Sequence, residues 1–223
     1  MNLPNNNDSW IILGPGRTGS KILVDSLTEL YQLHNIDLAT VEPTDDIVSI
    51  SPSTIYHSHL MSDTDFGNTV TYFVISIRDM VDCALSWTKR PHIGHYHLYE
   101  KTHSTHIQSL NNKIPAFYLD PNILLAEYNR VVMFYKVLNI DHVKNILIVD
   151  YDGVCGSGTR LLETLDFPCL VNPTSIPIKN PGTNEEWIIN WVEISQIIST
   201  LERRPENILL EKLTISTNNC ILV

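Results

Sequence analysis

The sequence predicts an α/β protein with a central parallel β-sheet flanked by helices. Apolar segments of strand length alternate with longer amphipathic segments, as expected of strand–helix–strand units with right-handed crossovers. The clearest strand is Thr69–Ile77, because nearly all of its residues are β-branched or aromatic, as in parallel strands buried on both faces. The chain has 223 residues, of which 43% are hydrophobic, so we expect one core and a single domain over residues 1–223.

The first half of the chain opens with a strand, a glycine-rich loop and a helix. The helix is indicated by Ile22, Leu23, Leu27 and Leu30, which recur at helical spacing and would pack on the sheet. The predicted elements are a strand at 9–13, a loop at 14–20, a helix at about 19–34, a mixed segment at 36–52, strands at 53–59 and 69–77, and a helix from 78 to about 87.

The second half contains a long helix and one further strand. A polar, histidine-rich region at 92–113 is expected to form a helix or a lid over the site. After it the pattern predicts a helix at about 121–140, a strand at 145–149, and helices near 157–165, 184–203 and 206–213. Ligands of open parallel sheets bind at the carboxyl ends of the strands, so the loop at 14–20, His59 and Arg78 are expected to gather there.

The charge of the chain limits its partners. A net charge of −10 argues against general affinity for nucleic acid or anionic membranes, so any phosphate site must be formed by locally gathered cations.

No membrane-spanning or signal segment is evident, and the four cysteines lack a disulfide or metal spacing, so we expect a cytoplasmic protein. Cys220–Val223 fits only the bare prenylation pattern, without a preceding basic segment, and is a weak sign of lipidation.

The loop between the first strand and the first helix has the character of a phosphate cradle. Backbone amides of a glycine-rich turn and the N-terminus of the following helix together form an anion site. Gly14 and Gly19 have the separation of the nucleotide-triphosphate motif G-x-x-x-x-G-K-[ST], but Ser20 and Lys21 stand in the reverse order.

The segment Gly14–Ser20 resembles the 5′-phosphosulfate-binding loop of sulfotransferases that use 3′-phosphoadenosine-5′-phosphosulfate. In that loop a basic residue precedes Ser/Thr-Gly-Ser/Thr, and Arg17 and Ser20 occupy the basic and hydroxyl positions without any reversal. The resemblance implies a P-loop NTPase-like sulfotransferase fold. It also implies phosphosulfate contacts from Gly16, Arg17, Thr18, Gly19 and Ser20, with Lys21 either a further contact or a surface lysine of the helix.

A second segment, Val74–Trp87, is similar to the 3′-phosphate-binding segment of the same family. Arg78 follows the apolar strand and Ser86 follows Arg78 by eight residues, which are the family's spacings. A guanidinium offers a planar fork to a phosphate, and a hydroxyl two helical turns later adds a neutral donor. The plainer interpretations are an Arg78–Asp79 ion pair and a solvent-facing Ser86.

A third segment, Tyr56–Leu60, resembles the part of cytosolic sulfotransferases that carries the catalytic histidine. The resemblance makes His59 the general base and Arg17 the principal cation at the departing phosphate. His57 is the alternative base, because a shift of two residues in a strand preserves the face to which a side chain points.

Fainter likenesses lie towards the C-terminus. The segment Val149–Gly153 resembles the element in which the family places an aromatic residue near adenine, so Tyr151 is a candidate contact. Residues 179–183, followed by Trp187, are only loosely like the loop that closes over the 3′-phosphate. Ile22 stands where several cytosolic members carry an adenine-stacking tryptophan.

The implied activity is transfer of a sulfuryl group to a hydroxyl or amine of a small molecule or glycan, leaving adenosine 3′,5′-bisphosphate and needing no metal. One alternative is a kinase or nucleotide hydrolase, in which Asp150 at the end of an apolar strand would hold magnesium. Another is a non-catalytic nucleotide-binding module of the same fold. The histidine-rich region is interpreted as acceptor-site lining or a polar lid rather than a metal site, although the spacing invites the metal hypothesis. Its histidines are His92, His95, His97, His103 and His106.

Overall fold

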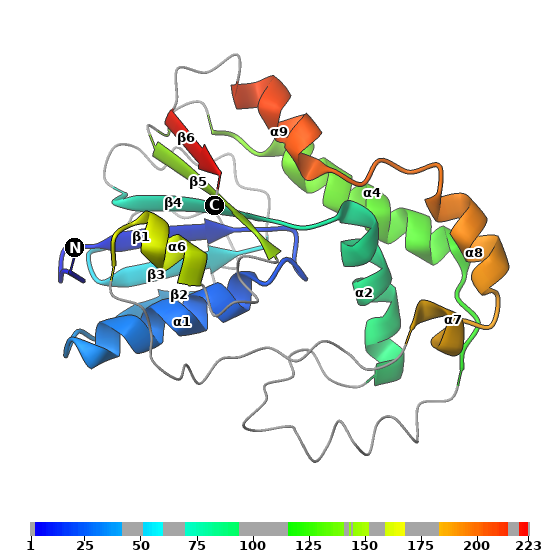
Figure 1. Ribbon diagram of the computed structural model, residues 1–223, viewed down its shortest axis with the longest axis horizontal. Coiled ribbons are helices and arrows are strands. Elements are labelled where there is room, and N and C mark those ends of the chain that lie inside the picture. The colour runs from blue at the N-terminus through cyan, green and yellow to red at the C-terminus, as the bar shows by residue number, and fades with distance from the viewer. Residues whose placement is uncertain are drawn as a thin grey trace.

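The computed structural model describes residues 3–41, 51–59, 70–93, 116–140, 143, 145–151, 159–167, 183–213 and 219–222. They form a six-stranded sheet in which every neighbouring pair of strands is parallel, with helices on both faces (Figure 1). The strands are β1 (Ser9–Leu13), β2 (Ala39–Val41), β3 (Thr54–Ser58), β4 (Tyr72–Ile77), β5 (Asn145–Asp150) and β6 (Asn219–Leu222). The predicted α/β class is therefore confirmed.

The order of the strands reverses at β1. In space the sheet runs β2-β3-β1-β4-β5-β6, so the chain moves from β1 to one side for β2 and β3, and then crosses to the other side for β4. Such a reversal leaves a crevice outside the carboxyl ends of the central strands, where ligands of α/β proteins bind. The glycine-rich loop leaves β1 at this point.

Two layers of helices enclose the sheet. The helices are α1 (Ser20–Leu33), α2 (Met80–Ile93), α4 (Pro121–Val137), α6 (Thr159–Thr164), α7 (Asn184–Trp187), α8 (Trp191–Ile198) and α9 (Pro205–Leu213). Alternate residues of β1 face opposite layers, since Trp10 and Ile12 pack with α1 and α6, whereas Ile11 and Leu13 pack with α2 and α4. All five residues of β1 are buried, which explains why the four that follow Ser9 are apolar.

Helix α2 continues beyond its predicted end near Trp87. It extends through Pro91 to Ile93, although the apolar periodicity stops earlier. Basic residues in the last turn, Arg90 and His92, interact favourably with the carboxyl end of the helix dipole. The extension matters for the site, because it carries Arg90 beside the ring of Trp87.

Other boundaries also differ from the sequence pattern. The helix predicted at 184–203 is two helices, α7 and α8, because Ile188 leaves the helix to form a bridge with Phe117. The long helix α4 ends at Val137 rather than near residue 140. The sequence pattern missed β2, which has only three residues and lies inside the segment predicted as mixed, and it also missed β6. Residues 94–113 of the predicted lid lie outside the described residues.

Within the described ranges, no helix combines the length and apolar composition needed to cross a bilayer.

Candidate functional site

The loop between β1 and α1 contains three residues in the left-handed region. Their φ angles are 76° at Gly16, 63° at Arg17 and 80° at Gly19. Glycine adopts this conformation readily, but Arg17 has a Cβ atom, so its backbone is strained and must be held by its surroundings. Gly19 is also the N-cap of α1 and offers no side chain to the free amides of the first turn.

Two glycines let the loop pack against β4 and α2. A Cβ atom on Gly14 would lie 2.3 Å from Ser76 Oγ, and one on Gly16 would lie 2.8 Å from the ring of Trp87. The Thr18 hydroxyl is 2.7 Å from Ser76 Oγ, whose own proton goes to the carbonyl of Leu13. The buried Thr18 side chain therefore holds the loop on the sheet, which leaves only its backbone for a ligand.

Arg17 connects the loop to both residues of the second motif. Its Nε donates to Ser86 Oγ at 2.8 Å, and Arg78 Nη1 donates to the carbonyl of Arg17 at 3.0 Å. Sequence resemblance divides these three residues between the two ends of a nucleotide. The structure brings them together as a single cluster, and the bond from Arg78 also holds the strained peptide of Arg17.

Asp79 does not neutralise Arg78. One oxygen of the Asp79 carboxylate accepts from the backbone amides of Val81 and Asp82 at the start of α2. The other oxygen accepts from Arg203 Nε at 2.6 Å. Arg78 makes no ion pair within the described part of the chain. Its guanidinium instead lies 4.1 Å from the ring centroid of Tyr151. Tyr151, the candidate adenine contact, is therefore beside Arg78, the predicted 3′-phosphate contact.

Two further cations beside the loop were not predicted. Arg90 of α2 and Arg130 of α4 each lie 4.7 Å from the ring centroid of Trp87, and Arg130 Nη1 donates to the carbonyl of Pro15 at 3.1 Å. Arg90 follows Ser86 by one helical turn, a spacing that could have pointed to it. Nothing near Arg130 in the sequence relates it to the loop, because 115 residues separate it from Pro15.

Two buried donors at this place lack acceptors. Trp87 Nε1 and Arg130 Nη2 have no hydrogen-bond partner in the described structure. A buried donor without a partner costs about 1–3 kcal/mol. An anionic oxygen that accepted a hydrogen bond from either donor would recover part of that cost.

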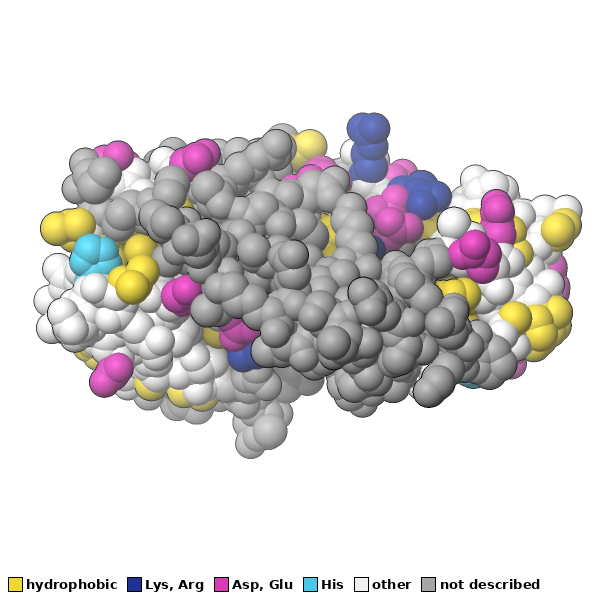
Figure 2. Space-filling model, turned by 60° about the horizontal axis from the view of Figure 1, so that its bottom comes forward, with side chains coloured by type: hydrophobic (Ala, Val, Ile, Leu, Met, Phe, Trp, Pro, Cys, Tyr) yellow, Lys and Arg dark blue, Asp and Glu magenta, His cyan; other side chains and the backbone are white. Residues whose placement is uncertain are grey.

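The cations repel one another in partly buried surroundings. Burial lowers the pKa of Arg17 below its usual value, and the Arg78 guanidinium lowers it further. The pKa of Lys89 is lowered by the same two causes, burial first and then Arg78. Acidic side chains are scattered over the face seen in Figure 2, in keeping with the net charge of −10, so this gathering of positive charge is local. A bound anion would relieve the repulsion.

The two histidines of β3 and its end have different environments. His57 is buried, and its Nε2 is hydrogen-bonded to Ser20 Oγ at 2.9 Å. His59 is exposed, and its Nδ1 lies 2.9 Å from the carbonyl of Gly14. A carbonyl oxygen only accepts, so Nδ1 carries the proton in the neutral ring and Nε2 keeps a lone pair.

Lys21 points along the surface of α1. Its Nζ pairs with Asp25 at 3.1 Å, and both side chains are about one-third exposed, at 35% and 30%. This ion pair agrees with the interpretation of Lys21 as a surface lysine of the helix. Ile22, at the position of the adenine-stacking tryptophan, is buried in the core beneath α1.

The remaining sequence candidates are partly described. Asp150 ends β5, in register with Ile77 and hence one strand removed from β1. His92 stacks on Phe117 with a centroid distance of 3.7 Å, and no group of three or more His, Cys, Asp or Glu residues within the described ranges could hold a metal. The other four histidines of the region, and residues 179–182, lie outside the described residues.

Fold and site together define an α/β protein with a cluster of cationic side chains beside the loop at which its strand order reverses. Comparison with protein-family models, curated proteins and solved structures finds no match to this chain.

Proposed function

We propose that the protein binds 3′-phosphoadenosine-5′-phosphosulfate and transfers its sulfuryl group to a hydroxyl or amine. The observation that carries the proposal is the hydrogen bond between Arg17 and Ser86, at 2.8 Å across 69 residues of sequence. The two motifs follow β1 and β4, which are neighbouring parallel strands, so what supports the proposal is the pair of residue types that meet there, an arginine and a serine. They meet at the carboxyl ends of the central strands, which is where ligands of such sheets bind.

The nucleotide contacts follow from the cluster. The loop residues Gly16, Arg17, Thr18, Gly19 and Ser20 would hold the 5′-phosphosulfate, with Thr18 acting through its backbone amide. Arg78 and Ser86 would hold the 3′-phosphate, and Tyr151 would lie at the adenine. Arg17 would reach both anionic groups, since its guanidinium already spans from the loop to α2.

His59 is the better of the two candidate bases. Its Nδ1–H is directed to the Gly14 carbonyl, so its Nε2 lone pair is available, whereas Nε2 of the buried His57 is engaged with Ser20. In the transfer, the acceptor oxygen or nitrogen forms a bond to sulfur and its proton passes to His59 Nε2. The bond from sulfur to the 5′-phosphate oxygen breaks, and adenosine 3′,5′-bisphosphate leaves with that electron pair. Arg17 and the loop amides would stabilise the added charge.

Calorimetry tests the nucleotide site. We expect adenosine 3′,5′-bisphosphate to bind without magnesium and in preference to magnesium-ATP. Arg78→Ala should weaken this binding by about tenfold or more, because a charged hydrogen bond contributes about 1.5–3 kcal/mol. The control is Arg204→Ala, at an exposed arginine that forms no ion pair among the described residues. Preference for magnesium-ATP would instead support the phosphoryl-transfer alternative with Asp150.

A transfer assay separates an enzyme from a binding module. His59→Ala should lower the transfer rate by about 10²–10⁴-fold, the usual contribution of a general base, while bisphosphate affinity stays within a fewfold of the parent. Bisphosphate binding without transfer to any hydroxyl or amine tested would favour the non-catalytic module. Unchanged transfer in the variant would show that His59 is not the base.

A further inference from the structure

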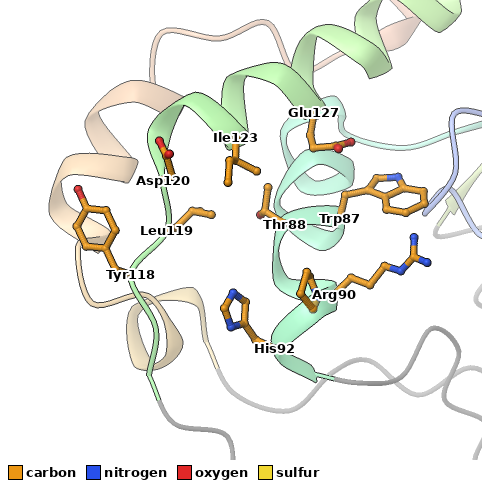
Figure 3. A pocket seen from close by; sticks show the side chains of 10 residues that line it. Trp87, Thr88, Arg90, His92, Tyr118, Leu119, Asp120, Ile123 and Glu127 are labelled. Carbon is orange, nitrogen blue, oxygen red and sulfur yellow. The ribbon is translucent and has the colours of Figure 1, made fainter.

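A pocket lies between the second half of α2 and the start of α4. Its volume is about 690 Å³, within the range of roughly 300–1,000 Å³ typical of small-molecule sites. The second half of α2, the start of α4 and residues 118–120 surround it (Figure 3). None of the residues given a role in the proposed transfer reaction lines it.

The wall of this pocket is mainly apolar. Pro91, Leu119 and Ile123 contribute aliphatic surface, and Trp87 lies at one side of the wall. Leu119, Ile123 and Thr88 lie around one space in Figure 3, while Trp87 and Arg90 extend together to the other side. An apolar body entering this space would lose contact with water on several sides, which is the main source of affinity for such ligands.

Most polar groups of the wall already have partners. The Thr88 hydroxyl donates to the carbonyl of Leu85 at 3.0 Å, and Asp120 accepts from the amide of Asn122 at 2.8 Å as the N-cap of α4. Glu127 pairs with Arg130 at 2.8 Å. A ligand with many hydroxyls, such as an oligosaccharide, would leave most of them without partners, which is costly in an apolar pocket.

His92 is one polar group of the wall that has capacity left for a ligand among the described residues. Its ring stacks on Phe117, and no described residue forms a hydrogen bond with it. An imidazole can accept from a hydroxyl at one nitrogen and donate at the other. The pocket therefore suits a ring-sized apolar molecule with one hydroxyl.

Two sets of contacts join this pocket to the loop. Trp87 lines the pocket and packs against Gly16, where an added Cβ would lie 2.8 Å from the ring. Glu127 lines the pocket and pairs with Arg130, which donates to the carbonyl of Pro15. A ligand that fixes Trp87 and Glu127 would fix the loop backbone on which an anion binds.

We infer that this pocket binds a small, uncharged molecule with a ring-sized apolar body and one hydroxyl, and that this binding strengthens anion binding at the loop. The inference concerns binding alone and does not depend on sulfuryl transfer. Sites coupled in this way typically change each other's affinity by about 5–150-fold, and by the same factor in both directions.

The first test uses 2-naphthol, a fluorescent aromatic alcohol that is uncharged at pH 7. We expect saturable binding of one molecule per chain, weakened about tenfold or more by Ile123→Glu, because a carboxylate in an apolar wall opposes an apolar ligand. The matched control is Ile189→Glu. Both isoleucines are exposed, by 54% and 68%, so neither variant should unfold the chain, but only Ile123 lines the pocket. Unsaturable binding, or equal weakening by both variants, would overturn the inference.

The second test measures the coupling with inorganic pyrophosphate, which needs cations but no adenosine site. Saturating 2-naphthol should raise pyrophosphate affinity about fivefold or more, and Glu127→Gln should reduce this factor by weakening the link to Arg130. If 2-naphthol leaves the pyrophosphate affinity unchanged, or if pyrophosphate does not bind at all, the inferred coupling is wrong. If both probes bind and the nucleotide does not, the proposed function fails while this inference stands.

Discussion

The Nε–H of Arg17 donates a hydrogen bond to the hydroxyl of Ser86 at 2.8 Å, which joins the strained loop after β1 to the helix after β4. The bond explains how a residue other than glycine keeps a φ of 63°, since the side chain is held by α2 while its carbonyl accepts from Arg78. Local strain of this kind persists where the surroundings enforce it, and such places are often functional. Hydrogen bonds thus hold the loop, β4 and α2 in fixed positions relative to one another.

Removing the Ser86 hydroxyl should weaken the anion site. In Ser86→Ala, Arg17 Nε loses its acceptor, and a bound phosphate loses a neutral donor. We expect adenosine 3′,5′-bisphosphate to bind about tenfold more weakly, which corresponds to about 1.4 kcal/mol. Calorimetry measures the change. The control is Ser195→Ala on α8, because the Ser195 hydroxyl donates to the Val192 carbonyl of its own helix. Equal affinities in parent and Ser86→Ala would contradict a role in binding.

Arg203 should act on the site indirectly. It holds the Asp79 carboxylate at 2.6 Å, and without it Asp79 can turn towards the neighbouring Arg78. Arg203→Met should therefore weaken bisphosphate binding severalfold and make the affinity less sensitive to salt, because Arg78 would be partly neutralised.

A double-mutant cycle separates this effect from general damage. Asp79→Asn removes the competing charge, so adding Arg203→Met to Asp79→Asn should have little further effect on affinity. If Arg203→Met weakens bisphosphate binding by the same factor in the parent and in Asp79→Asn, Arg203 does not act through Asp79. Thermal unfolding of all three variants checks that the cap of α2 is retained.

The Thr18 hydroxyl should matter for stability more than for binding. In Thr18→Val the hydroxyl of Ser76, fully buried in the sheet, loses its donor partner. We expect a loss of about 1–3 kcal/mol in the free energy of unfolding, measured by urea denaturation. Thr18→Ser keeps the hydrogen bond and should lose less. A Thr18→Val protein as stable as the parent would contradict a structural role for this bond.

Alkaline pH should destabilise the fold through Cys83. Burial raises the pKa of this thiol from 9.0 to about 12, so above pH 9 the unfolded chain releases the proton more readily than the folded chain. The unfolded state then binds fewer protons, and the free energy of unfolding falls as pH rises from about 9 to 12. Tyr31 contributes in the same direction, because burial also raises its pKa.

Cys83→Ala isolates the contribution of the thiol. Its stability should fall less steeply between pH 9 and 11 than that of the parent, as measured by urea denaturation at each pH. Identical slopes would show that Cys83 does not contribute. The same burial predicts that the native thiol reacts slowly with iodoacetamide at pH 8 and reacts fully once the chain is unfolded.

Several elements could be predicted because their signals are local. β1, β4 and β5 consist mainly of buried apolar residues, and α1 shows its buried side as a repeat of apolar residues. The edge strand β2 has no such signal, since three residues are too few to show a repeat. The division of 184–203 into α7 and α8 depends on a bridge to Phe117, far away in sequence.

The sequence by itself determined the α/β class, the loop after β1, and the candidates Arg17, Arg78, Ser86 and His59, because strand composition, glycine spacing and short motifs are local properties. Tertiary structure alone decided that Arg17 meets Ser86, that Asp79 turns to Arg203, that His59 is exposed while His57 is buried, and that Arg130 joins the loop. These contacts depend on how α2 and α4 pack against the sheet. That packing is set by burial summed over the whole core, and no single stretch of sequence records it.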